Sequence, residues 1–313
     1  MSDFAGLQRG AGGGAENAPS AFYRVWLWKM GLACVRIMPD FLLKLLCLTM
    51  AEAYFRLRPG RRETVVRNLL PVVGQQRQLA EKKARELFRS FAVKLADLWR
   101  FECGLPMDRW LTAGTDWGIL ETACARKRGV LLLTPHLGNW ELGGALLARR
   151  GIKIVVLTQA EPGAGLTELR QASRARWGIE TFLVGNNGFD FVDIIRRLQD
   201  GENIALLIDR PPEAKAVEVE LFGRPFRASV AAAELARASG CAVLGVVVAR
   251  EGNKYAARIL PEFIYDRAAL GSRENRQKFT QQILSAFEPE IRRYPEQWFH
   301  FVPIWPGSDK PAR

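Results

Sequence analysis

The stretch VLLLTPHLGNWELGGALLAR, residues 130–149, decides the fold that the sequence predicts. It opens with a short apolar run that is typical of a buried strand. Pro135 cannot extend a central strand, and Asn139 is a favourable residue at the start of a helix. The residues after Asn139 are rich in Leu and Ala and predict a helix. The stretch therefore predicts a strand, a loop and a helix, with His136 in the loop and Glu141 in the first helical turn.

The same alternation of short strands and helices continues along the rest of the chain. The expected strands cover residues 130–133, 153–158, 180–184, 203–208, 241–249 and 255–260. The expected helices cover residues 139–149, 166–177, 189–199, 229–239 and 274–293, and an amphipathic helix at 78–101 precedes them. Alternation of this kind predicts an α/β fold with a mostly parallel sheet flanked by helices.

His136 and Glu141 are the first candidates for catalysis. Histidine changes its charge near neutral pH and suits general-base work, and a nearby carboxylate suits the task of holding the ring. Catalytic groups gather at the carboxyl ends of strands in open α/β sheets, which is where the loop places His136. Gly138 has the conformational freedom to fold His136 back over Glu141. The alternative is a histidine that is packed and hydrogen-bonded without a catalytic role.

Asp209 is a second acid at the end of an apolar strand, in the segment NIALLIDRPP. If this strand runs parallel to the one before His136, both residues lie at the same edge of the sheet. The alternative is a structural ion pair between Asp209 and the neighbouring Arg210.

The segment LFGRPFRAS, residues 221–229, places Gly223 and Arg224 in a basic turn. Ser229 is expected to cap the helix at 229–239, whose first amides would face whatever the turn holds. This arrangement predicts a cradle for a phosphate group. The aromatic segment YPEQWFHFVPIW, residues 294–305, contains His300, and core packing is the favoured interpretation there.

Composition and charge narrow the class of partner. The chain of 313 residues has 45 Lys and Arg against 33 Asp and Glu, which gives a net charge of +12. Such an excess of positive charge favours a negatively charged binding partner, which can be nucleic acid, an acidic protein or a phospholipid surface. The sequence has no helix-turn-helix, zinc-finger or RNA-recognition signature, so we expect no nucleic-acid partner. A hydrophobic content of 48% excludes disorder for most of the chain.

The cysteines indicate a reduced, cytosol-facing protein. Five are present, without a close pair, and the chain has only two histidines. An odd number without a C-x-x-C spacing argues against a disulfide framework and against a metal site. We therefore expect no bound metal and no cofactor.

The N-terminal region has a different composition. Residues 1–20 are rich in Gly and Ala and predict a flexible tail. Residues 21–58 are apolar and aromatic, but charged residues interrupt every stretch long enough to span a membrane. Pro39 is expected to divide this segment into two helices. Aromatic rings with interspersed cations favour a membrane-associating helical segment at the lipid interface, and a pair of ordinary core helices is the alternative.

A cluster of arginines follows the apolar segment directly, in the stretch RLRPGRRETVVRN, residues 56–68. A basic cluster in this position predicts an edge that faces lipid phosphates. The alternative is a solvated loop.

Several of these features occur together, and in the same order, in a known family. The spacing His136-x-x-x-x-Glu141 after an apolar strand is similar to the first motif of the lysophospholipid acyltransferase superfamily. The longer string HLGNWEL resembles the branch of bacterial lipid A late acyltransferases and mycobacterial phosphatidylinositol mannoside acyltransferases. The basic RNLL stretch, the strand ending in Asp209, LFGRP and YPEQW also resemble that branch. The resemblance spans roughly residues 22–305.

This resemblance implies a glycerolipid acyltransferase-like domain at residues 59–305, followed by a tail at 306–313. It implies transfer of an acyl group from acyl carrier protein, or from coenzyme A, to a hydroxyl of a glycolipid or lipid A-type acceptor. The reaction would take place at the cytoplasmic face of the inner membrane. In it, His136 would be the general base, Glu141 its orienting partner and Asp209 a second acid. The implied substrate-binding residues are Asn139, Arg210, Gly223 and Arg224, with Arg224 on a substrate phosphate.

The sequence departs from the lipid A enzymes at two places. Those enzymes usually carry an arginine where this chain has LVGNNGFDF, and two arginines near the end where it has WFHFVPIW. Both differences fall where the acceptor could be recognised, so the acceptor stays open. The alternative acceptor is a lysophospholipid or a phosphatidylinositol mannoside. If water replaced the acceptor, the protein would be a hydrolase. A non-catalytic membrane adaptor is the alternative from another class of protein.

Overall fold

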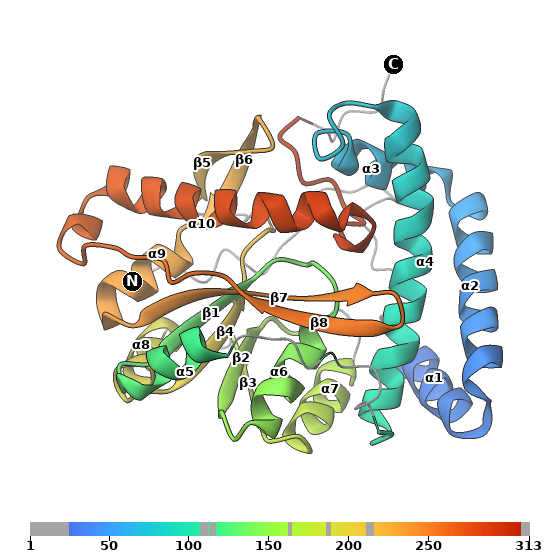
Figure 1. Ribbon diagram of the computed structural model, residues 1–313, viewed down its shortest axis with the longest axis horizontal. Coiled ribbons are helices and arrows are strands. Elements are labelled where there is room, and N and C mark those ends of the chain that lie inside the picture. The colour runs from blue at the N-terminus through green and yellow to red at the C-terminus, as the bar shows by residue number, and fades with distance from the viewer. Residues whose placement is uncertain are drawn as a thin grey trace.

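The computed structural model describes residues 25–106, 112, 117–161, 165–185, 189–210 and 216–307. Its centre is a six-stranded sheet with the order β3-β2-β4-β1-β7-β8 (Figure 1). The strands are β1 (Val130–Thr134), β2 (Ile154–Thr158), β3 (Ile179–Leu183), β4 (Asn203–Leu207), β7 (Ala242–Glu251) and β8 (Lys254–Ile259). All neighbours pair in parallel except β7 and β8. The expected α/β fold with a mostly parallel sheet is confirmed.

Helices cover both faces of this sheet. They are α5 (Gly118–Ala125), α6 (Trp140–Arg149), α7 (Leu166–Ala175), α8 (Asp190–Gln199), α9 (Ala231–Ser239) and α10 (Arg273–Arg293), with the short 3₁₀ helices η4 (Ala269–Gly271) and η5 (Pro295–Gln297). In Figure 1, α10 lies above the sheet and α6 and α7 lie below it. Each strand and helix named from the sequence lies within two residues of its observed bounds.

The central strand β1 shows why the apolar run predicted a buried strand. Leu131 and Leu133 pack into one core with α9 and α10, whereas Val130 and Leu132 pack into another with α5 and α6. Alternate side chains of a strand point to opposite faces of the sheet, and here both faces are buried against helices. The run is therefore apolar at every position.

The N-terminal helices form a separate layer at one side of the sheet (Figure 1). They are α1 (Val25–Ile37), α2 (Asp40–Leu57), α3 (Pro59–Leu69) and α4 (Arg77–Glu102), and the first three contact α4. The expected division at Pro39 is confirmed, because one helix ends and the next begins on either side of it. Within the described part of the chain, no helix has both the length and the apolar character to cross a membrane. The tail expected at 1–20 and residues 308–313 lie outside the described residues.

The arginine-rich stretch at 56–68 is not a solvated loop. Most of it belongs to α3, which begins with Pro59 in its first turn and buries Val65, Val66 and Leu69. A proline at this position is compatible with a helix because the first amides have no partner in the helix. Arg61 donates a hydrogen bond to the main-chain oxygen of Phe301 at 3.0 Å. The basic helix therefore also anchors the C-terminal segment.

A hairpin that the sequence analysis missed lies between β4 and α9. Its strands are β5 (Ala216–Leu221) and β6 (Arg224–Ser229), paired antiparallel. Phe222 and Gly223 form the two-residue turn with φ values of 53° and 72°, and two positive values are what a tight type I′ hairpin turn requires. The helix expected from residue 229 begins at Ala231, because Ser229 still belongs to the strand.

Candidate active site

The loop after β1 holds His136 by its main chain. The His136 oxygen accepts a hydrogen bond from the amide of Phe299 at 2.8 Å, and the Gly138 amide donates to Gln297 at 2.9 Å. Gly138 has a φ of 64°, and a Cβ atom there would lie 2.0 Å from the Val248 oxygen. Only glycine fits such a position. The loop is therefore fixed between β7 and the C-terminal segment, and its glycine permits a close backbone contact.

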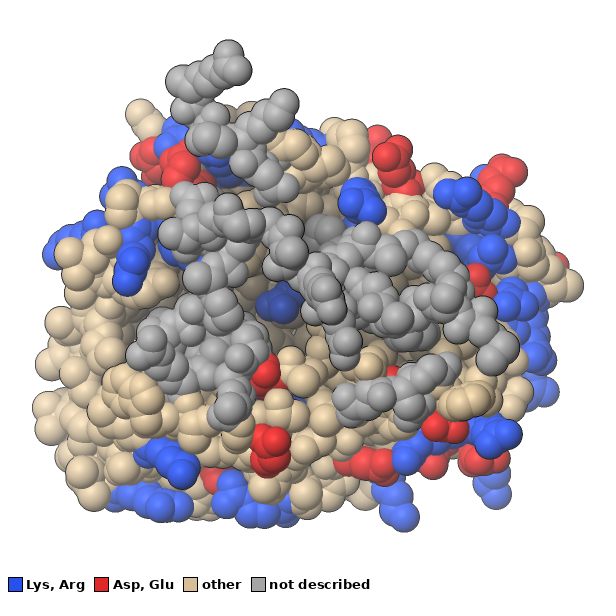
Figure 2. Space-filling view, turned by 180° about the vertical axis from the view of Figure 1, so that it is seen from behind, with Lys and Arg blue, Asp and Glu red and all other residues tan. Residues whose placement is uncertain are grey.

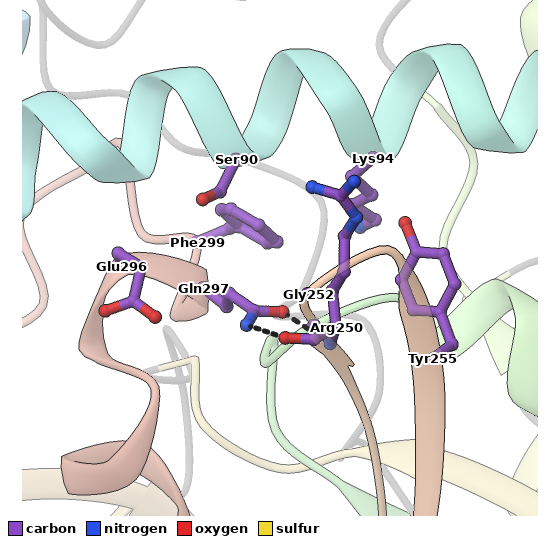
Figure 3. Close-up of a pocket in the computed structure, with 9 residues that line it drawn as sticks. Ser90, Lys94, Arg250, Gly252, Tyr255, Glu296, Gln297 and Phe299 are labelled. Atoms are coloured by element: carbon purple, nitrogen blue, oxygen red, sulfur yellow. Dashed lines mark hydrogen bonds between the residues drawn. The ribbon is translucent and has the colours of Figure 1, made fainter. Parts of the chain in front are cut away.

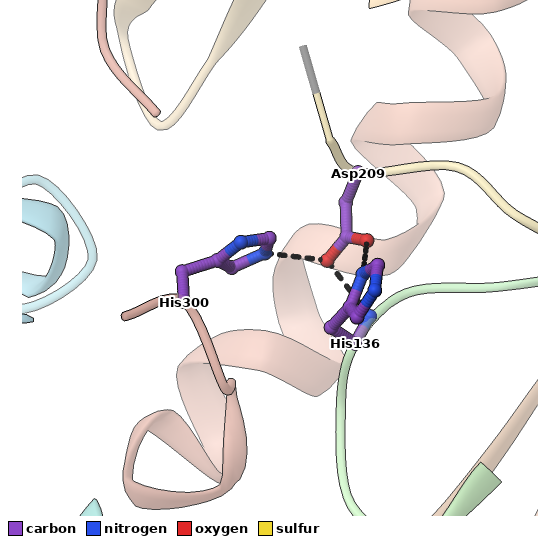
Figure 4. A group of neighbouring side chains, drawn as sticks. All are labelled: His136, Asp209 and His300. Carbon is purple, nitrogen blue, oxygen red and sulfur yellow. Dashed lines mark hydrogen bonds and ion pairs between the residues drawn. The ribbon is translucent and has the colours of Figure 1, made fainter. Parts of the chain in front are cut away.

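Asp209 is the partner of the His136 ring (Figure 4). Nδ1 of His136 lies 2.6 Å from Oδ1 of Asp209, and the His136 amide donates to Oδ2 at 2.8 Å. Asp209 comes just after β4, whose Leu207 pairs in register with Thr134 of β1. Parallel pairing of the two strands thus brings both residues to the same carboxyl edge. The expectation that they share this edge is confirmed.

Two residues that the sequence analysis assigned to core packing complete this cluster. Trp298 donates from Nε1 to Oδ2 of Asp209 at 2.7 Å, and Nε2 of His300 lies 2.8 Å from the same oxygen. Both side chains are buried, as expected, but they also hold the carboxylate. The one available signal was that His300 is the second of only two histidines, and no spacing connects it to residue 136.

Burial and hydrogen bonding set the charges of this cluster. Burial raises the pKa of Asp209, but His136 and His300 lower it further, so the pKa lies well below its ordinary value. Burial lowers the pKa of His136 more than Asp209 raises it, and the net pKa lies below the ordinary 6.5. At neutral pH the aspartate is therefore ionised and the imidazole neutral. With Nδ1–H donated to Asp209, the second nitrogen of the ring has the lone pair of a base.

The ligand atoms of His136, Asp209 and His300 lie within 4.8 Å of one another, a spacing that a metal ion could use. One nitrogen of each imidazole, however, faces a carboxylate oxygen of Asp209 at hydrogen-bonding distance. The direct pairing makes this cluster a hydrogen-bonded triad.

Glu141 does not hold the His136 ring, so this part of the sequence-based expectation is wrong. Its carboxylate accepts hydrogen bonds from Arg174, Nε to Oε2 at 3.0 Å and NH2 to Oε1 at 2.8 Å, and a further short one from Arg170. Burial raises the pKa of Glu141, but the two guanidinium groups lower it to well below its ordinary value. The first turn of α6 directs this side chain toward α7 and away from the imidazole. Glu141 is thus a largely buried anion, 11% exposed, between two arginines.

The other expected substrate-binding residues lie in different places. Asn139 is fully buried and precedes α6, but its side chain does not cap the helix. Its main-chain amide donates to the main-chain oxygen of Val248 at 2.7 Å. Arg210 is exposed beside Asp209, whose carboxylate bonds the two histidines and Trp298 instead.

Gly223 and Arg224 belong to the β5–β6 hairpin. The exposed Arg224 guanidinium lies 5.7 Å from the centroid of the Trp305 ring. Among the described residues, no contact joins Arg224 to His136 or Asp209. The cradle expected from a turn followed by a helix is not formed, because a strand occupies residues 224–229.

The fold and the site define an α/β enzyme with a buried His–Asp pair at the carboxyl edge of its sheet. Residues 17–306 match the family model described as bacterial lipid A biosynthesis acyltransferase, and the chain belongs to this family. The resemblance drawn from HLGNWEL and the motifs after it is thereby confirmed. The chain is a lipid acyltransferase that transfers groups other than amino-acyl groups.

Curated relatives bear related names. The chain is 26% identical over 261 residues to a phosphatidylinositol mannoside acyltransferase of Mycolicibacterium smegmatis, covering 82% of this chain and 83% of the relative. It is also 26% identical over 293 residues to a phosphatidylinositol mannoside acyltransferase of Mycobacterium tuberculosis, covering 90% and 88% of the two chains. The similarity thus extends over more than four fifths of the length of each relative.

Proposed function

We propose that the protein moves a fatty acyl group from acyl carrier protein, or from acyl-CoA, to a hydroxyl of a membrane glycolipid or lipid A-type acceptor, with His136 as general base. The observation that carries this proposal is the 2.6 Å contact between Nδ1 of His136 and Oδ1 of Asp209. This contact supports a neutral imidazole whose other nitrogen accepts a proton. Asp209, held by four donors, would orient the ring and stabilise the imidazolium as it forms.

The acyl group passes directly from the thioester to the acceptor hydroxyl, without a covalent acyl-enzyme intermediate. Nε2 of His136 removes the proton of the acceptor hydroxyl while the oxygen attacks the thioester carbonyl. The tetrahedral intermediate collapses with cleavage of the C–S bond, and the leaving thiolate takes up the proton from the imidazolium. A hydroxyl is a weak acid, so a positioned base contributes about 10²- to 10⁴-fold to the rate.

The names of the curated relatives support a second acceptor, a phosphatidylinositol mannoside. A hydroxyl of the acceptor attacks the thioester in both cases, so the catalytic step is the same. A lysophospholipid acceptor and hydrolysis by water would use the same base.

One assay separates these reactions. The purified protein is incubated with a labelled acyl thioester on acyl carrier protein or coenzyme A, with each candidate acceptor in turn, and the products are identified by mass spectrometry. We expect one acceptor to gain a single acyl mass. Free fatty acid as the only product would show a hydrolase, and no turnover with any donor would favour the adaptor.

We also propose that the protein lies on the cytoplasmic face of the inner membrane through α1 and α2. On α2, Leu43, Cys47 and Ala51 are buried, whereas Phe41 and Leu45 are 68% and 60% exposed. Further exposed apolar side chains on the two helices are Trp26, Met30, Ile37, Leu42, Leu46, Met50 and Leu57. An apolar face of this extent supports burial in the lipid interface.

Basic side chains add to this proposal without forming one continuous patch. Arg56 and Arg58 are exposed on either side of Leu57 at the end of α2. On the opposite side of the molecule from the view of Figure 1, Lys and Arg are interspersed with Asp and Glu along the edges (Figure 2). The electrostatic contribution to membrane binding should therefore be moderate and sensitive to salt.

Flotation with phospholipid vesicles tests this placement. The double variant Phe41→Ser, Leu45→Ser should lose most of its binding, because two side chains that enter the lipid become polar. Ile264→Ser is the matched control, since Ile264 is 74% exposed outside these helices. Equal loss of binding in both variants, or a wild-type protein that does not float, would refute the proposal.

A further inference from the structure

A pocket lies beside the His136 loop, between α4, the end of β7 and η5 (Figure 3). Its volume is about 180 Å³, which is room for several water molecules or a small polar ligand group. Its polar lining includes Ser90, Lys94, Arg250 and Tyr255, and Gly138 of the loop forms part of its wall. The pocket therefore shares a wall with the loop that carries the proposed base.

Lys94 is a buried cation in this pocket. It is 5% exposed, and its ammonium lies 2.9 Å from the centroid of the Trp140 ring. Among the described residues, no carboxylate oxygen lies within 4.0 Å of it, and the nearby Glu141 is held by two arginines. Burial lowers the pKa of Lys94 well below its ordinary value, more than Glu141 raises it. The charged form of this amine is costly without a counterion, and an anion bound in the pocket would stabilise the ammonium.

Arg250 brings a second cation to the same place. Its main chain is fixed by Gln297, which accepts from the Arg250 amide and donates to the Arg250 oxygen, both at 2.8 Å. Figure 3 shows its guanidinium extending toward α4, beside Lys94. Within the described segments, the side chain has one long contact, to Asn253 at 3.4 Å, and its Nε is buried without a hydrogen-bond partner. Its donors are thus largely available to a ligand.

The acids around the pocket already have other partners. Glu296 pairs with Lys83 at 2.8 Å, and Asp97 accepts a hydrogen bond from Tyr255 at 2.8 Å. Two cations facing one cavity, with their neighbouring acids engaged elsewhere, favour an anionic ligand. A lysine ammonium and a planar guanidinium together are typical of a phosphate site.

We propose that the pocket formed by Lys94 and Arg250 binds a phosphate group of one of the two substrates. This inference rests on the proposed acyl transfer for the identity of its ligand. Trp140 separates the pocket from the base, since its ring lies against Lys94 on one side and 5.2 Å from the His136 ring, centroid to centroid. The phosphate would therefore be a group that does not react, and it would position the substrate. This role is the one that the sequence suggested for Arg224.

Both substrates can supply such a group. The pantetheine arm is joined through a phosphodiester in acyl carrier protein and through a diphosphate in coenzyme A, and a phospholipid acceptor carries its own phosphodiester. A phosphate that does not react is bound equally before and during the reaction, so its loss raises KM and leaves kcat nearly unchanged. The substrate whose KM rises identifies the source.

The decisive variants are Lys94→Met, which keeps the apolar stem, and Arg250→Gln. Each should raise the KM of one and the same substrate by about tenfold or more, because a charge-assisted hydrogen bond is lost. Their kcat should stay within about threefold of wild type. Lys278→Met is the matched control, since this exposed lysine pairs only with Glu274 on α10 among the described residues. Unchanged KM values for both substrates in both variants would overturn the proposal.

Thermal unfolding with inorganic phosphate or pyrophosphate tests the pocket independently of catalysis. A ligand that binds only the native state raises Tm as its concentration increases. The rise should occur in the wild type and in Lys278→Met, and be reduced in Arg250→Gln and Lys94→Met. If acyl transfer is not detected but this difference is, the proposed function fails and the pocket stands. An equal rise in Tm for all four proteins would exclude phosphate binding in the pocket, whatever their acyl-transfer activity.

Discussion

The two carboxylates of Glu141 and Asp209, both near His136, have different surroundings. Glu141 is five residues away in the sequence, but it is bound by Arg170 and Arg174. Asp209 is 73 residues away, and it holds the imidazole. Both acids stay ionised, one because of arginines and the other because of histidines. The difference shows that strand pairing, rather than closeness in sequence, determines which acid serves the base.

Removal of the imidazole should have the largest effect. We expect His136→Ala to lower kcat by about 10²- to 10⁴-fold with a nearly unchanged KM, because the base acts in the transition state. Steady-state kinetics with the acceptor identified above measures this loss, and circular dichroism checks the fold. A folded variant with wild-type activity would remove His136 from the mechanism.

Asp209→Asn should have the next largest effect and lower kcat by about 10²- to 10³-fold. The amide favours the wrong imidazole tautomer and cannot stabilise the positive charge of the ring. The double variant with His136→Ala should lose little more than His136→Ala alone, since the two side chains act as a unit. Multiplicative losses in that double variant would break the assignment of Asp209 as the partner.

Glu141→Gln should act mainly on stability. It removes the paired carboxylate from the buried Arg174 and one of the two carboxylates that pair with Arg170, and we expect a loss of about 3 kcal/mol in the free energy of unfolding. Denaturant titration measures this loss, and the loss in activity at a temperature where the variant is folded should be smaller than that of Asp209→Asn. A stable Glu141→Gln protein as inactive as Asp209→Asn would reverse the comparison of the two acids.

His300→Gln should give a smaller decrease. The variant removes one of the donors to Asp209 but leaves the contact with His136 intact, so kcat should fall by about tenfold, the order expected for a hydrogen bond to a charged group. The effect should be absent in an Asp209→Asn background. An additional tenfold loss there would mean that His300 acts independently of Asp209.

The smallest expected effect is that of pH near neutrality. Burial places the pKa of His136 below 6.5, so the imidazole is already deprotonated at pH 7. We expect kcat/KM to be constant between pH 7 and 8 and to decrease only as the pH falls below 6.5, because protonation removes the base. An increase through pH 7 to 8 that disappears in His136→Ala would show that the pKa of the base is not lowered.

Local patterns in the sequence were sufficient for the secondary structure and for the position of His136. The run at 130–133 and the proline after it predicted the strand and the loop, because both act over a few residues. The hairpin at 216–229 was missed for a similar physical reason. Its turn requires positive φ at Phe222 as well as at Gly223, and the sequence has none of the residues that usually signal this at the first position.

The sequence by itself determined the α/β class, the family and the edge of the sheet at which His136 and Asp209 meet. Only the tertiary structure decided that Asp209 holds the ring, that Glu141 faces the arginines, and that His300 and Trp298 complete the cluster. It also placed Lys94 and Arg250, which are 156 residues apart, in one pocket. Helix and strand periodicity are local properties, whereas the partner of a buried charge depends on which distant segments the packed core brings within hydrogen-bonding distance.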